Sequence, residues 1–91
     1  MYKFIICIDY ETAQEGNAFI AHLQTKNLGW WHRMTGSWMI ASATPLTSLQ
    51  LRDSVLIYFP NRKTLVIDMQ TKGWCGWGVP SEFDWFDTSW K

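Results

Sequence analysis

Residues 29–42 constrain the fold of this chain more than any other stretch, because two short alternating runs, GWWHRM and SWMIAS, are joined by Thr35 and Gly36. Such a pattern predicts a β-hairpin. Side chains alternate across a strand, so Trp31 and Arg33 share one face of the first run and His32 lies on the other. A hairpin with three tryptophans is hard to solvate, and we expect other elements to cover one of its faces.

The aromatic content exceeds what one small core can hold. A chain of 91 residues forms one domain, and a domain of this size buries only about 60–65% of its unfolded surface. Seven Trp, five Phe and three Tyr are present, and each such ring buries about 150–250 Å². Some indoles are therefore expected in an oligomer interface or a ligand site, and we predict a homodimer or higher oligomer.

Charge and cysteine usage narrow the class of protein. The net charge is zero, which argues against a protein that holds long duplex nucleic acid through many phosphates. Cys7 and Cys75 lack partners at metal-ligand spacing, so we interpret them as reduced thiols of a cytoplasmic protein. No basic and apolar leader and no apolar run of about 18 residues are present, so neither secretion nor membrane contact is expected.

The first third of the chain predicts a strand and a helix. Residues 2–10 are apolar on both faces in the middle of the run, which is typical of a central strand covered on both sides. Thr12 and Glu15 have the spacing of a capping box, so a helix is expected to begin near Ala13. Residues 27–29 end it, since Gly29 accepts the left-handed conformation at a helix C-terminus.

The remaining pattern completes a ferredoxin-like order. Thr44 and Pro45 predict the start of a second helix, because proline suits the first turn. Residues 63–69 alternate again and predict the last strand. The order βαββαβ closes as an α+β fold, a four-stranded antiparallel sheet of order 4-1-3-2 with the first and third strands central. This arrangement leaves one face of the sheet without helices.

A C-terminal extension is a candidate to cover that face. Residues 73–78 contain three glycines and predict a tight turn. Four apolar residues then follow at helical spacing: Val79, Phe83, Phe86 and Trp90. We therefore divide the chain into a ferredoxin-like domain, 1–78, and a helical or extended tail, 79–91, that packs on the sheet or on a second subunit.

Three segments taken together, residues 30–40, 63–68 and 73–78, resemble the SinR family, small proteins similar to the CRISPR-associated ferredoxin-like endoribonuclease that partners the CRISPR integrase. The resemblance implies a ferredoxin-like subunit that is commonly a homodimer. The CRISPR-associated relatives are metal-dependent nucleases or nonenzymatic scaffolds. Their motif aspartate ends the first strand, and Asp9 occupies that place in this chain.

Asp9 is therefore the candidate catalytic and metal-binding residue. Its carboxylate suits Mg²⁺, a hard cation that prefers oxygen ligands, and two Asp9 side chains across a dimer axis can share one ion. The alternative is a strand-end carboxylate that accepts backbone N–H groups of the following turn.

The candidate ligand-binding residues come from the hairpin and from the Gly/Trp loop, residues 73–78: Trp31, His32, Arg33, Trp74 and Trp77. An indole beside a guanidinium can stack a nucleobase while the arginine binds a phosphate. The alternatives are cross-strand aromatic packing in the hairpin, with the arginine in solvent, and packing of the tail by the loop. We expect the hairpin and the loop to form one continuous site.

Three functions stay open at this point. The first is a small dimeric protein, without a cofactor, that captures a short or cyclic oligonucleotide, as suits phage–host conflict. The second is an Mg²⁺-dependent nuclease centred on Asp9, and the third is a protein-binding module that uses the same tryptophans. The neutral charge and the lone carboxylate favour the binding protein over the enzyme.

Overall fold

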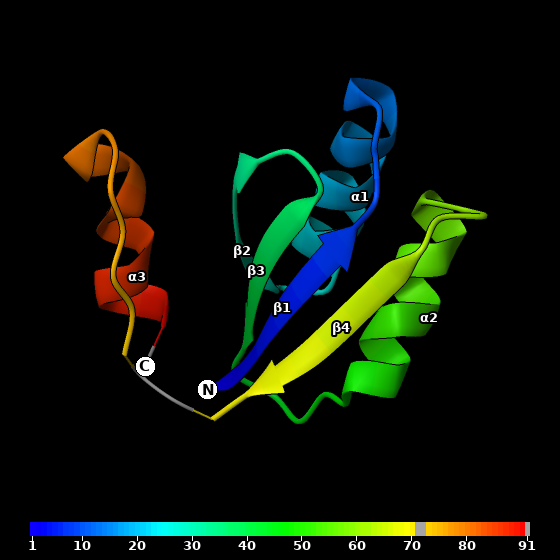
Figure 1. The fold of residues 1–91 in the computed structure, drawn as a ribbon. Helices are drawn as coiled ribbons and strands as arrows, with labels where there is room; N and C mark the ends of the chain where they lie inside the picture. Colours follow the sequence, from blue (N-terminus) through cyan, green and yellow to red (C-terminus); the bar gives the residue numbers. More distant parts are fainter. Residues whose placement is uncertain (71–72, 91) are drawn as a thin grey trace.

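A computed structural model describes residues 1–70 and 73–90. Its strands form one antiparallel sheet of order β2-β3-β1-β4, so the ferredoxin-like prediction is confirmed, with β1 and β3 central (Figure 1). The elements are β1 (Tyr2–Ile8), α1 (Ala13–Thr25), β2 (Gly29–Met34), β3 (Ser37–Ser42), α2 (Ser48–Tyr58), β4 (Thr64–Met69), the 3-10 turn η1 (Pro80–Phe83) and α3 (Asp84–Ser89).

Helix α1 begins where the capping box predicts. The Thr12 hydroxyl accepts the N–H of Glu15 at 3.2 Å, and the Glu15 carboxylate accepts the N–H of Thr12 at 3.0 Å. The end of the helix differs from the prediction, because the left-handed residue is Asn27, with φ 55°, and Gly29 already belongs to β2. Asparagine tolerates this conformation better than most residues.

Helix α2 begins three residues later than Pro45 suggested. Its N-cap is Thr47, whose hydroxyl accepts the N–H of Gln50 at 3.1 Å while the Gln50 side chain accepts the N–H of Thr47 at 3.0 Å. This second capping box satisfies two free backbone donors. The preceding residues are held in a turn by Ser42, whose hydroxyl donates to the Thr44 carbonyl at 2.7 Å. The predicted start at Pro45 is therefore wrong.

The sheet separates two apolar layers. Both long helices lie on one face and the C-terminal segment lies on the other (Figure 1). The helix-side core consists of buried residues from four elements and from the start of the segment after α2: Phe4, Ile6, Ile8, Phe19, Leu23, Trp38, Ile40, Leu51, Val55 and Phe59.

The other layer forms where the tail crosses the sheet face that the helices leave open. Its buried residues are Trp31, Phe86 and Trp90, and half-buried side chains from both sides pack around them. No helix formed by the described residues, 1–70 and 73–90, is long and apolar enough to cross a membrane.

Candidate functional site

A cavity of about 440 Å³ lies between the open face of the sheet and the Gly/Trp loop. Ligand sites of proteins commonly have volumes of about 300–1,000 Å³. The strands contribute Ile5, Met39 and Met69 to the lining, and the tail contributes Phe83 and Phe86 among others. The cavity therefore exists because a short aromatic tail, rather than a third long helix, covers this face.

Four of the predicted ligand-binding residues line this one cavity: Trp31, Arg33, Trp74 and Trp77. Trp31 and Arg33 come from β2, and the other two come from the loop after β4, at the opposite edge of the sheet. The tail brings the two segments together, because its return across the sheet places the loop opposite the hairpin.

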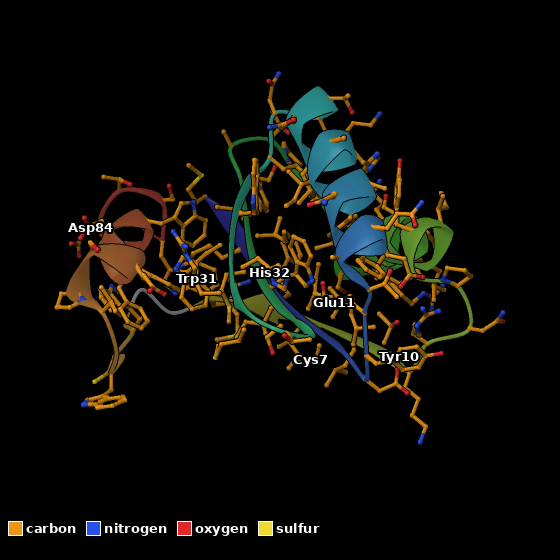
Figure 2. All side chains as sticks on the ribbon, turned by 90° about the horizontal axis from the view of Figure 1, so that it is seen from above. Cys7, Tyr10, Glu11, Trp31, His32 and Asp84 are labelled. Carbon is orange, nitrogen blue, oxygen red and sulfur yellow. The ribbon has the colours of Figure 1, made fainter. Side chains whose placement is uncertain are left out.

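Trp31 joins the tail to the sheet. Its indole N–H donates to the Glu82 carbonyl at 2.5 Å, and its ring stacks on Phe83 with 5.6 Å between centroids. The side chain is 6% exposed. Figure 2 shows Trp31 between the strands and the tail. The polar atom of this indole is already engaged, so Trp31 serves as a wall of the cavity.

The two loop tryptophans are far more accessible. Trp74 lies nearly parallel to Phe83, at 6.0 Å and 16°, and is 41% exposed, whereas Trp77 is 97% exposed. Gly76 explains how the loop approaches the tail, because a Cβ there would lie 2.7 Å from a ring carbon of Phe83. The loop thus packs one indole and presents the other to solvent.

Arg33 lies in the irregular part of the hairpin, since the register between β2 and β3 shifts between Trp31 and Met34. Such bulges redirect side chains next to functional sites. Arg33 and Glu82 line the main cavity and also a neighbouring cavity of about 330 Å³ between β2 and the tail. Within residues 1–70 and 73–90, neither side chain forms an ion pair or a hydrogen bond.

His32 points to the helix layer, as strand alternation requires, and does not line the main cavity. Its ring stacks on Trp38 with centroids 3.6 Å apart and planes 3° apart. Nδ1 lies 2.8 Å from the Ser37 carbonyl oxygen and Nε2 lies 3.1 Å from the Glu11 carboxylate. The structure therefore separates His32 from the other predicted ligand-binding residues, although it borders the neighbouring cavity.

Glu11, which sequence analysis missed, has a half-buried position and a buried carboxylate group. Its side chain is 6% exposed, and its carboxylate accepts the N–H of Gly36 at 2.6 Å as well as facing His32. Figure 2 shows Glu11 in the segment before α1, on the helix side of the hairpin. Its partners lie 21 and 25 residues away, so no local pattern in the sequence indicates them.

Asp9 lies away from this aromatic cavity. It is exposed at the end of β1 and lines a separate hollow with Cys7, Lys63 and Leu65. Its backbone N–H donates to the Lys63 carbonyl at 3.2 Å. In the part of the chain that the structure describes, no group of three or more His, Cys, Asp or Glu residues is placed to hold a metal ion.

Together the fold and the cavity define a ferredoxin-like α+β domain whose open sheet face is covered by an aromatic tail. A scan against protein-family models, a search of curated proteins and a search of solved structures each gave no match for this chain.

Proposed function

We propose that this protein is a non-catalytic binding protein that captures a nucleotide-like ligand, a short or cyclic oligonucleotide, in the cavity under the Gly/Trp loop. One observation carries the proposal: accessible indoles of Trp74 and Trp77 line the same cavity as the guanidinium of Arg33, which has no ion-pair or hydrogen-bond partner among residues 1–70 and 73–90.

The indoles can bind the base of a nucleotide, and the guanidinium can bind its phosphate. Every base has an aromatic face, and stacking on an aromatic side chain contributes about 1–3 kcal/mol per base. A guanidinium binds a phosphate through two parallel N–H groups. Trp77 is 97% exposed, so a base stacked on it would remove a large apolar surface from water.

The neutral charge of the chain also fits a small ligand better than a long one. Long duplex nucleic acid is held through many lysine and arginine contacts with phosphates. The described lining of the main cavity offers Arg33 as its cation, beside Glu82. One or two phosphates therefore match the site better than an extended backbone.

We further propose that the protein acts in the cytoplasm as a SinR-like homodimer in phage–host conflict, where it would remove a signalling nucleotide. The uncovered part of the open sheet face supports a second copy, because Leu65 is 56% exposed and Ile67 is 41% exposed on the edge strand β4. Light scattering is expected to give twice the monomer mass at micromolar concentration. A monomer mass throughout would contradict the dimer.

The test of function is incubation with labelled short RNA, short DNA and cyclic oligonucleotides, with and without Mg²⁺. We expect retention without cleavage, and a loss of retention in Trp77→Ala. The matched control is Ile57→Ala, which truncates a side chain that is 72% exposed on α2, on the other side of the sheet.

Two other outcomes would replace the proposal. Cleavage that needs Mg²⁺ and disappears in Asp9→Asn would establish a nuclease. The nuclease is the second candidate function because Asp9 directly follows β1, the place of the motif aspartate in the CRISPR-associated proteins. Failure to retain any of these probes would contradict nucleotide capture and favour a protein partner for the exposed Trp77.

A further inference from the structure

Resting on the function proposed above, we propose that the captured nucleotide carries guanine, that the carboxylate of Glu82 binds the base, and that Arg33 binds the phosphate. Two side chains of opposite charge line one cavity. Neither Arg33 nor Glu82 is neutralised by another described residue or by the other. A ligand that offers hydrogen-bond donors at one end and an anion at the other satisfies both.

The backbone of Glu82 is fixed at the edge of this cavity. Its carbonyl accepts the indole N–H of Trp31 at 2.5 Å, and its N–H donates to the Val79 carbonyl at 3.0 Å. Its carboxylate has no ion-pair or hydrogen-bond partner among the residues that the structure describes. Because the neighbouring Phe83 contacts both Trp31 and Trp74, Glu82 is held beside the aromatic surface on which a base would stack.

The chemistry of a carboxylate selects among the bases. An ionised carboxylate only accepts hydrogen bonds, through two oxygens. The Watson–Crick edge of guanine presents two adjacent donors, N1–H and the N2 amino group. Adenine and cytosine present one donor beside an acceptor, and uracil presents one donor between two acceptors. Against those three bases one carboxylate oxygen would face a lone pair, and a site built for donors rejects such ligands.

Arg33 is suited to bind the phosphate of the nucleotide. Its guanidinium has five N–H donors in a planar fork and matches a phosphate in two-point contact. The bulge that contains Arg33 places it on the same two cavities as Glu82. The two charges therefore select a base and its phosphate as one unit.

Calorimetric titration with the 5′-phosphorylated dinucleotides pGpG, pApA, pCpC and pUpU tests this assignment, with pIpI as the analogue that lacks the N2 amino group. We expect pGpG to bind at least tenfold more tightly than each of the others, including pIpI. Glu82→Gln should weaken pGpG about tenfold and leave pApA unchanged, because the amide replaces one acceptor with a donor. The control is Asp84→Asn, an exposed carboxylate on the outer side of the tail (Figure 2).

The possible failures are distinguishable. If all five dinucleotides bind equally and Glu82→Gln has no effect, while Trp77→Ala weakens every one, guanine selection is overturned and nucleotide capture stands. Equal weakening of all five by Glu82→Gln also overturns guanine selection. If none of the five binds, the assignment is overturned, and capture of cyclic oligonucleotides in the retention experiment still decides the proposed function.

Discussion

The two faces of the sheet are covered in different ways. On one face, α1 and α2 bury Phe4, Phe19, Trp38 and Val55 completely. On the other face, the tail buries Trp31, Phe86 and Trp90 to between 4% and 8% exposure and leaves a cavity of about 440 Å³. The same sheet thus has a fully buried core on one face and, on the other, core residues that border this cavity.

The difference follows from the lengths of the covering elements and from their caps. Helices α1 and α2 have 13 and 11 residues, and each begins with a capping box. Helix α3 has six residues and no side-chain cap. A helix this short is unstable alone in water. The tail therefore depends on its aromatic contacts with the sheet.

The largest effect is expected from Trp38→Ala, which removes the largest fully buried side chain of the helix-side core. Trp38 is fully buried between Phe19 and His32, and Trp→Ala in a core costs about 3–5 kcal/mol. The free energy of unfolding, measured in urea, should fall by this amount. Trp77→Ala is the control and should leave it nearly unchanged, because that indole is 97% exposed. If both variants lost the same amount of unfolding free energy, the two faces of the sheet would not differ in their contribution to stability.

A smaller and more local effect is expected from Phe86→Ala on the tail side. The ring contacts Trp31, Trp74 and Trp90 at 5.0–5.7 Å, but the cavity already borders it, so we expect a loss of about 2–4 kcal/mol. Amide hydrogen exchange should rise in residues 80–90 and stay unchanged in β1. Uniform acceleration across the sheet would mean that the tail and the helix layer unfold as one unit.

The pH dependence of stability should arise on the helix side, at Glu15. Hydrogen bonds from Thr12, first of all from its backbone N–H, and the Arg62 guanidinium hold the pKa of Glu15 below its ordinary value. A lowered folded-state pKa stabilises the fold fully above the unfolded-state pKa of about 4.3, and this stabilisation is lost as pH falls through the folded-state pKa.

Glu15→Gln tests this assignment because glutamine keeps the capping acceptor and removes the charge. Urea unfolding between pH 7 and pH 2 should show a shallower decline for the variant than for the wild type. Parallel curves would assign the acid sensitivity to other titratable groups, among them His22, whose pKa is lowered by burial.

The smallest effect on stability is expected from Arg33→Ala. Its side chain is exposed and has no partner among residues 1–70 and 73–90, so the free energy of unfolding should change by less than about 0.5 kcal/mol. Affinity for an anionic nucleotide should fall strongly, whereas Arg52→Ala on α2 should leave it unchanged. A large drop in melting temperature with intact binding would make Arg33 a structural residue.

Local patterns predicted most of the fold. The two-sided apolar run of β1, the Thr12 capping box and the alternation of the hairpin each depend on neighbours within a few residues. The start of α2 was also encoded locally, by Thr47 and Gln50. Pro45 gave a misleading signal there, because proline is common both in first helical turns and in the turns before them.

The site was only partly predictable. Alternation places Trp31 and Arg33 on one face, and the structure gathers them with Trp74 and Trp77. Strand alternation does not tell which of these indoles is buried, because the burial of each indole depends on where the tail docks. Glu11 could not be found in this way, since its hydrogen bonds join residues that only the folded hairpin brings together.

The most direct test of the cavity as a nucleotide site is to follow the indole N–H resonances of all seven tryptophans during titration with pGpG, pApA, pCpC and pUpU in turn. We predict that at least one dinucleotide shifts the resonances of Trp74 and Trp77 and leaves that of Trp38 in place. If no dinucleotide moves Trp74 or Trp77, or if only indoles outside the cavity respond, binding of short linear nucleotides in this cavity is contradicted.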